Sequence, residues 1–150
     1  MTDPAGRLLA LDLGAVRIGL ALSDLLGITA QPLDALKRIG PRKDLQAVAA
    51  LVGERDVGTV VVGLPLKLSG EEGSAAAEAR EFAAKLERRV GKVRVVLWDE
   101  RMTTVQAERV LIRGDVRRRK RREKIDSMAA ALILQSYLDA RKAPPAGPHV

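Results

Sequence analysis

Apolar residues occur along this chain in short runs whose spacing separates strands from helices. Residues 8–13 and 17–23 are aliphatic runs with a short connection between them, which predicts an antiparallel hairpin. A weaker run near residues 28–30 predicts a third short strand. Residues 58–63 and 93–98 predict two more strands, and the first of these does not alternate with polar residues. Such a run is typical of a strand that is buried on both faces.

Between and after these strands, apolar positions recur every three or four residues, which predicts helices. The segments are 43–55, 74–89 and 123–140, and a further helix is predicted to begin at Thr103, because Thr103 and Gln106 form a capping box. The predicted buried stripes are Ala75, Ala79, Phe82 and Leu86 in the second helix, and Ile125, Met128, Ala129, Leu132, Ile133 and Tyr137 in the last.

The order of these elements predicts the fold class. Strands in a meander are followed by helix, strand, helix, strand and two helices, and the β-α-β unit requires a parallel, right-handed crossover. We therefore expect an α/β fold in which a mixed sheet, an antiparallel meander plus parallel strands, is flanked by helices. Residues 1–140 are expected to form one domain and residues 141–150 a disordered tail.

Composition excludes several kinds of chemistry. The 150 residues contain no Cys and a single His, His149, so thiol catalysis, a Cys-based metal site and a Ser–His–Asp triad are excluded. The longest uncharged run, residues 127–138, is shorter than the roughly 18 residues of a membrane helix. The N-terminus has no pattern of a signal peptide. We expect a soluble cytoplasmic protein without membrane contact.

Three acidic residues stand at unusual places. Asp12 lies near the end of the first strand, Glu100 follows the 93–98 strand together with Asp99, and Asp126 lies at the start of the last predicted helix. Ligands of open α/β sheets bind at the carboxyl ends of parallel strands. If the first strand runs parallel to the 93–98 strand, Asp12 and Glu100 share that edge, and Asp126 can reach it from the helix.

Converging carboxylates repel one another unless a cation lies between them. Mg²⁺ or Mn²⁺ takes oxygen ligands of this kind, and two such ions can activate a water and stabilise the leaving oxygen of a phosphodiester. Each acid also has a simpler interpretation. Asp12 can form a turn, and Asp99 or Glu100 can solvate the end of a strand, with Glu100 the better ligand candidate. Asp126 can be an acid of the first helical turn that the helix dipole stabilises.

Charge is concentrated in one segment. The net charge is +7, and such a basic protein is expected to bind a polyanion such as nucleic acid. Residues 113–124 carry eight basic residues against Asp115 and Glu123, so they hold +6 of the +7. The basic residues are Arg113, Arg117, Arg118, Arg119, Lys120, Arg121, Arg122 and Lys124. We expect them to clamp phosphates, although such a run can also be a solvated loop. Lys67 follows the 58–63 strand and is either a further phosphate contact or part of an ordinary loop.

Four stretches of the chain, residues 9–24, 60–70, 98–108 and 124–138, resemble the YqgF/RuvX family in its order and spacing. That family is described as Holliday junction resolvases and as nucleases that process the 5′ end of pre-16S rRNA, with a ribonuclease H-like fold. The resemblance implies that Asp12, Glu100 and Asp126 are its acidic catalytic and metal-binding positions. Ala129 and Ala130 stand where the fold often shows a fourth acid.

The resemblance further implies an endonuclease that uses one or two Mg²⁺ or Mn²⁺ ions, acts on precursor rRNA or branched DNA in the cytoplasm, and forms a homodimer. Two other functions stay open at this point. One is a non-catalytic RNA-binding factor of ribosome assembly with the same fold. The other is an actin-like ATPase-type domain, because residues 12–14 after a strand resemble a phosphate loop of that class.

Overall fold

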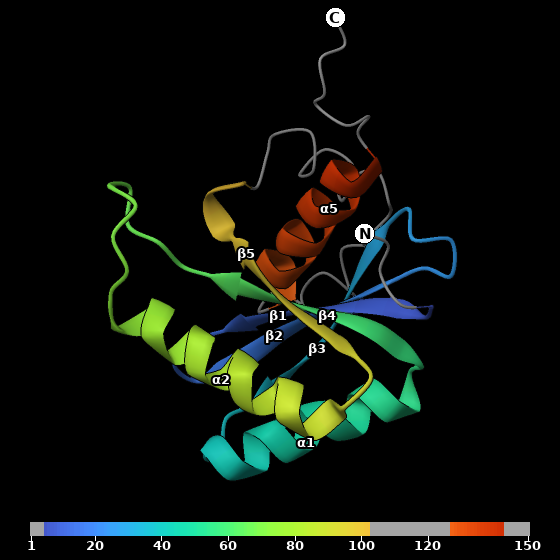
Figure 1. Ribbon diagram of the computed structural model, residues 1–150, viewed down its shortest axis with the longest axis horizontal. Coiled ribbons are helices and arrows are strands. Elements are labelled where there is room, and N and C mark those ends of the chain that lie inside the picture. Colours follow the sequence, from blue (N-terminus) through green and yellow to red (C-terminus); the bar gives the residue numbers. More distant parts are fainter. Residues whose placement is uncertain (1–4, 103–126, 143–150) are drawn as a thin grey trace, which may run out of the picture.

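The computed structural model describes residues 5–102 and 127–142, which form a five-stranded sheet between helices (Figure 1). The elements in chain order are β1 (Arg7–Leu13), β2 (Arg17–Ser23), β3 (Ala30–Lys37), α1 (Pro41–Glu54), β4 (Val57–Leu64), α2 (Ser74–Val90), β5 (Arg94–Asp99), the 3₁₀ helix η1 (Glu100–Met102) and α5 (Met128–Lys142). The predicted mixed α/β class is confirmed.

The strand order is β3-β2-β1-β4-β5. β1 and β2 form the predicted antiparallel hairpin, in which Leu13 pairs with Ile18 and Asp12 with Gly19. β1 pairs with β4 in parallel, and β4 pairs with β5 in parallel. β1, β4 and β5 therefore run in one direction, and their carboxyl ends meet at one edge of the sheet.

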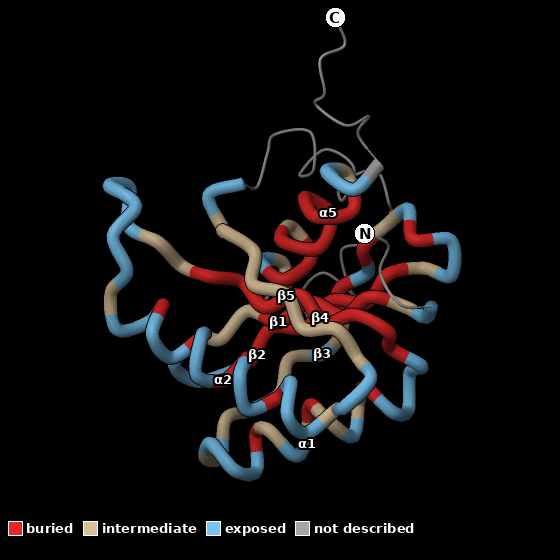
Figure 2. Tube along the Cα trace, viewed as in Figure 1, coloured by how far each residue is buried: buried red, intermediate tan, exposed pale blue. Residues whose placement is uncertain are grey.

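The two faces of the sheet bury separate cores. α1 and α2 cover one face, and α5 crosses the other (Figure 1). On β1, Leu9 and Leu11 belong to the core under α1 and α2, whereas Leu8 and Ala10 belong to the core under α5. Every residue of β4 is buried, as the Val-rich run predicted, and the central strands form the most buried part of the molecule (Figure 2).

A third strand is present, but its predicted bounds were wrong. β3 occupies Ala30–Lys37 rather than residues 28–30. It pairs with β2 alone and so lies at an edge of the sheet. Edge strands tolerate proline and charge because one side of their backbone needs no partner. Pro32, Asp34 and Lys37 therefore hide this strand from a search for apolar runs.

Two predicted helical stripes need correction. In α2 Ala76 is buried in place of the predicted Ala75, which is exposed. In α5 Ala129 is exposed, while Leu134 and Leu138 are fully buried. The cause in α5 is its broad contact with the sheet, because it packs on β1, β2, β3 and β4. A helix that is apolar on most sides does not reveal from its sequence which side faces the sheet.

The end of the chain also differs from the prediction. Residues 141 and 142 belong to α5 instead of the disordered tail, and residues 143–150 lie outside the described residues. The helix predicted from Thr103 and the basic segment 113–124 lie outside them as well. Within residues 5–102 and 127–142, no helix combines the length and apolar character that crossing a membrane requires.

Candidate active site

Two of the three acids that the sequence singled out come together at the carboxyl edge of the parallel strands. Asp12 is the next-to-last residue of β1, and Glu100 opens η1 directly after β5. Asp12 follows Leu8 and Ala10 on the face that α5 covers, because alternate residues of a strand share a face. Their charges interact, since the carboxylate of Asp12 raises the pKa of Glu100.

The environment of this acid pair disfavours ionisation. Burial, the charge of Asp12 and the charge of Asp99, in decreasing order, raise the pKa of Glu100 to about 7. Burial also raises the pKa of Asp12 above its ordinary value. Two partly buried carboxylates that oppose each other's charge are costly for a fold. A hard divalent cation would remove this cost, and carboxylate oxygens are the ligands that Mg²⁺ and Mn²⁺ prefer.

Gly63, near the end of β4, leaves space for the Glu100 side chain because it has no side chain of its own. A Cβ atom at this position would lie 3.2 Å from Cγ and 3.3 Å from Cδ of Glu100, and 2.7 Å from Cδ1 of Ile133 in α5. A side chain on Gly63 would therefore displace the carboxyl group, the Ile133 side chain or both. The sequence showed this glycine only as the end of a strand, because the close approach depends on β5 and α5, which are distant in sequence.

The residues on both sides of Glu100 are tied to α5 through one hydroxyl group. Nε1 of Trp98 donates a hydrogen bond to Oγ of Ser136 at 3.1 Å, and this hydroxyl donates to the carbonyl oxygen of Met102 at 2.8 Å. The ring of Trp98 also packs edge to face against Tyr137, with 5.1 Å between the centroids. Ser136 thus holds the end of β5 and the end of η1 on the same helix.

Asp99, the neighbour of Glu100, is engaged by Arg101. Its carboxylate accepts hydrogen bonds from the backbone N–H of Arg101 at 2.9 Å and from the guanidinium at 2.8 Å and 3.1 Å. The bonds from the Arg101 side chain lower the pKa of Asp99. Arg101 holds this carboxylate ionised, whereas the pKa of Glu100 is raised, and we therefore favour Glu100 as the ligand.

Asp126 lies outside the described residues, so the structure does not place the third predicted acid. Among the residues that are described, no three acidic or histidine side chains gather into a metal site. Ser127, the next residue in sequence, is fully buried. Its Oγ accepts the backbone N–H of Leu20 in β2 at 3.0 Å, one residue beyond Gly19, which pairs with Asp12.

The predicted phosphate contacts are placed only in part. Lys67 is exposed in the loop between β4 and α2, where its backbone N–H donates to the carbonyl of Glu71. This loop leaves the sheet at the same edge as the acid pair. The basic residues of segment 113–124 lie outside the described residues, and their contact with nucleic acid stays a prediction.

Comparisons with known proteins show a family of nucleases to which this chain is similar. The family model of RuvX, described as Holliday junction resolvase, matches residues 6–140. A protein of Koribacter versatilis named "Putative pre-16S rRNA nuclease" is 49% identical over 144 residues, which are 94% of each chain. One of Geobacillus kaustophilus with the same name is 49% identical over 91% of this chain and 99% of its own.

Solved structures show the same fold at low identity. RuvC of T. thermophilus in complex with a Holliday junction matches with a TM-score of 0.62 and 16% identity, covering 92% of this chain and 98% of that one. A fowlpox virus resolvase bound to Holliday junction DNA matches with a TM-score of 0.58 and 15% identity, covering 91% and 99%. The expected ribonuclease H-like fold is therefore confirmed.

Proposed function

This chain belongs to the RuvX family, and from that membership we propose that it is a Mg²⁺- or Mn²⁺-dependent endonuclease that hydrolyses phosphodiester bonds in structured nucleic acid. The observation that carries the proposal is the partly buried pair of Asp12 and Glu100 at the carboxyl edge of the parallel strands. Both carboxyl groups have raised pKa values, in contrast to Asp99, whose pKa is lowered by the bonds from Arg101.

Asp12, Glu100 and Asp126 would hold one or two ions. Support for Asp126 comes from its neighbour, because Ser127 is bonded to β2 beside the residue that pairs with Asp12, and consecutive Cα atoms are only about 3.8 Å apart. A bound ion of this kind lowers the pKa of a water and stabilises charge on a phosphoryl oxygen.

The remaining residues of the site have positioning and binding roles in this proposal. Gly63 leaves the space in which the Glu100 carboxyl lies, and Ser136 holds both flanks of η1 on α5. Glu100 must give up its proton when a cation binds, because a carboxylate coordinates in its ionised form. Lys67 and the basic segment 113–124 would bind the phosphate backbone.

As substrate we favour the 5′ region of precursor 16S rRNA. The relatives that carry this activity in their names are 49% and 48% identical over more than 90% of this chain, whereas the resolvase structures share the fold alone. The family description names the Holliday junction as the second candidate. A four-way junction has two-fold symmetry and would suit a homodimer, which stays a prediction. Either substrate would place the protein in the cytoplasm.

A cleavage assay tests the proposal. Wild type, Asp12→Asn and Asp126→Asn are each incubated with Mg²⁺ or Mn²⁺ and a precursor 16S rRNA 5′ fragment, a four-way DNA junction or a linear duplex of matched sequence. Asp34→Asn, which removes an exposed acid of β3, is the matched control. We expect wild type and the control to cut one structured substrate, and the two site variants to bind it without cutting.

Two results would contradict the proposal. Full cleavage by Asp12→Asn or Asp126→Asn would show that the acids are assigned wrongly. Binding of the RNA by the wild type without cleavage under either metal would favour a non-catalytic factor of ribosome assembly.

A further inference from the structure

We propose that a second basic surface, formed by Arg17, Lys37, Arg42 and Lys43, binds the phosphate backbone of the substrate on the β3 side of the acid pair. The inference rests on the proposed function and extends it, because it assigns nucleic-acid contacts to residues remote from segment 113–124. All four side chains are exposed. At two separate positions, on the sheet and at the start of α1, these cations destabilise the element that carries them.

The first placement is on the sheet. Arg17 at the start of β2 and Lys37 at the end of β3 are direct partners in the antiparallel register. Like charges on directly opposite residues of neighbouring strands destabilise the pair. An edge strand such as β3 tolerates a charged residue. An acidic residue in place of Lys37 would be equally tolerated there and would stabilise the pairing with Arg17.

The second placement is on α1, which begins with Pro41, Arg42 and Lys43 and has no basic residue in its last turn. The N-terminus of a helix carries the positive end of its dipole, so cations there are unfavourable. α2 shows the stabilising arrangement instead, with Arg88 and Arg89 in its last turn. Asp44 of the same turn is bound to Arg38, so Arg42 and Lys43 stand at the end where unpaired cations weaken the helix.

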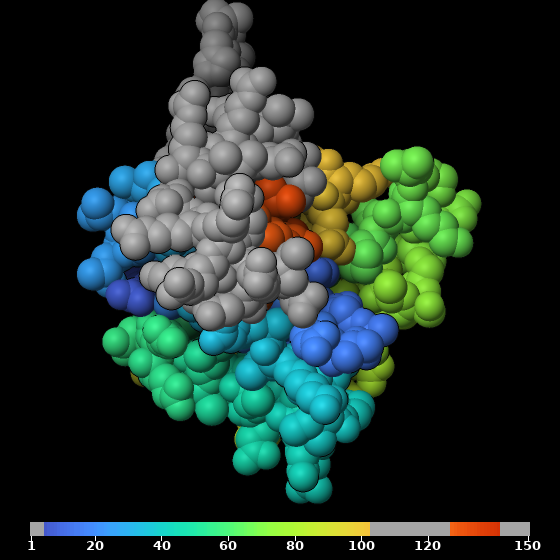
Figure 3. All heavy atoms as spheres, turned by 180° about the vertical axis from the view of Figure 1, so that it is seen from behind, coloured from blue at the N-terminus to red at the C-terminus, as the bar shows by residue number. Residues whose placement is uncertain are grey.

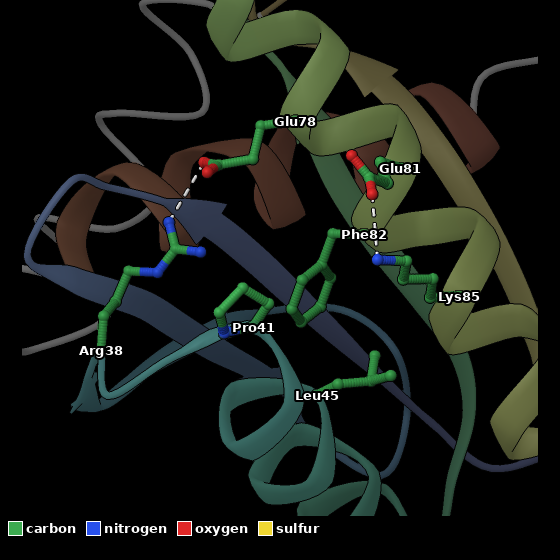
Figure 4. Close-up of a pocket in the computed structure, with 7 residues that line it drawn as sticks. All are labelled: Arg38, Pro41, Leu45, Glu78, Glu81, Phe82 and Lys85. Carbon is green, nitrogen blue, oxygen red and sulfur yellow. Dashed lines mark hydrogen bonds and ion pairs between the residues drawn. The ribbon is translucent and has the colours of Figure 1, made fainter.

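No acidic side chain of the described part of the chain forms a salt bridge with Lys37, Arg42 or Lys43. Asp44 of α1 and Glu78 of α2 are bound to Arg38, whose Nε lies 3.2 Å from Oδ2 of Asp44. One of its terminal nitrogens lies 3.1 Å from Oε1 of Glu78 (Figure 4). Lys37, Arg42 and Lys43 thus retain their positive charges, which a polyanion would offset.

The location of this surface matches a path for the substrate. The turn between β1 and β2 lies against the segment that leads into α1, as the adjoining blue and cyan atoms show (Figure 3). The backbone N–H of Arg38 donates to the carbonyl of Val16, and its side chain donates to that of Gly14. β3 and β1 are two strand spacings apart, about 10 Å. A backbone that crosses Asp12 towards β3 would reach these cations.

The test compares two variants with the same change of net charge. Lys37→Gln/Arg42→Gln/Lys43→Gln removes three cations of the surface, while Arg17 is retained because it has other contacts. Arg88→Gln/Arg89→Gln/Lys92→Gln removes three exposed cations at the far end of α2. Binding of a labelled four-way DNA junction and a labelled precursor 16S rRNA fragment is measured by fluorescence anisotropy in EDTA, across salt concentrations.

We expect the surface variant to lower the salt slope of binding by about 2–3 on at least one probe, because each phosphate contact contributes roughly 0.7–0.9. The control variant should keep the wild-type slope within about 1. Thermal unfolding gives a second readout. The surface variant should melt no lower than wild type, since it loses repulsive placements, and the control should melt lower than the surface variant.

The outcomes separate this inference from the proposed function. If both triple variants change the slope equally while wild type binds, the basic surface has no specific role and the proposed function stands. If wild type binds neither probe, the proposed function itself fails. A surface variant that unfolds more easily than the control would show that these cations serve the fold, which also overturns the inference.

Discussion

Two clusters of charged residues at the same edge of the sheet, around Asp44 and around Glu100, differ in how the surrounding residues affect a buried carboxyl group. Around Asp44, the fold supplies every partner, because its carboxylate accepts hydrogen bonds from the backbone N–H groups of Ile39 and Gly40 and from Arg38. Around Glu100, burial and the charge of a second acid, Asp12, both oppose ionisation.

The pKa values follow this difference. Burial acts to raise the pKa of Asp44, but the bonds from Ile39, Arg38 and Gly40 outweigh it, and the pKa is lowered. Burial, the charge of Asp12 and the charge of Asp99 together raise the pKa of Glu100 to about 7. A cluster that neutralises itself serves the structure, whereas like charges that are brought together with raised pKa values are typical of functional sites.

Replacing Glu100 by Gln should separate activity from stability most strongly. Loss of a metal ligand should lower cleavage by more than the roughly 10–100-fold that the loss of outer-shell partners costs. The free energy of unfolding in EDTA should not fall, because the substitution removes a buried charge opposed by Asp12. Cleavage rates and denaturant unfolding of the same preparation measure both. Equal losses of activity and stability would mean that Glu100 serves the fold.

Replacing Asp44 by Asn tests the other cluster and should lower the free energy of unfolding. Arg38 would lose its buried partner, and breaking a buried ion pair costs about 3 kcal/mol of unfolding free energy. Glu78→Gln is the control, because the Glu78 side chain is 53% exposed and that of Asp44 only 3%. Exposed pairs contribute about 0–1 kcal/mol. Similar losses in both variants, measured by urea unfolding, would contradict the structural role of the Asp44 cluster.

Adding a single methyl group at Gly63 tests whether this glycine positions the Glu100 carboxyl group. In Gly63→Ala the new Cβ would crowd Glu100 and Ile133, and we expect cleavage to fall by about 10–100-fold, as for the loss of groups that orient a metal ligand. Gly53→Ala in α1 is the control, since its added Cβ meets no heavy atom within 4 Å beyond the adjacent residues and backbone of its own helix. Excess Mn²⁺ should restore part of the Gly63→Ala activity. Unchanged activity would mean that Gly63 does not position Glu100.

Sequence patterns revealed the parts of this fold that depend on local order. The hairpin of β1 and β2, the buried β4 and the helices α1 and α2 follow from apolar spacing, and the direction of the strands placed Asp12 and Glu100 at one edge. β3 escaped because an edge strand has few apolar residues. The role of Asp126 is untested, since it lies outside the described residues.

Contacts between distant segments could not be predicted in the same way. Ser136 was one polar residue in an apolar helix, and nothing near it in sequence indicates that it bridges Trp98 and Met102. The same holds for Ser127, which accepts the N–H of Leu20. Such hydroxyl groups can be recognised as positioning groups only after the helix has been packed on the sheet.

The pH dependence of stability gives the smallest but most direct test of the two clusters. The pKa of Glu100 is about 7 in the folded protein and 4.5 as its ordinary value, so the folded state binds more protons between these pH values. The free energy of unfolding of the metal-free protein should therefore decrease as pH rises from about 4.5 to 7. Asp44, whose pKa is lowered below 3.8, contributes stability that is lost only as pH falls below about 4.

Urea unfolding in EDTA from pH 3 to 8 measures both trends on one protein. Glu100→Gln should flatten the decrease between pH 4.5 and 7 and keep the loss below pH 4, because only the acid pair has changed. Asp44→Asn should do the reverse. Addition of Mg²⁺ or Mn²⁺ to wild type should turn the decrease into a rise, since the cation binds the ionised carboxylates and stabilises the folded state. Parallel profiles for wild type and Glu100→Gln would show that Glu100 does not titrate in this range, and the contrast between the two clusters would then fail.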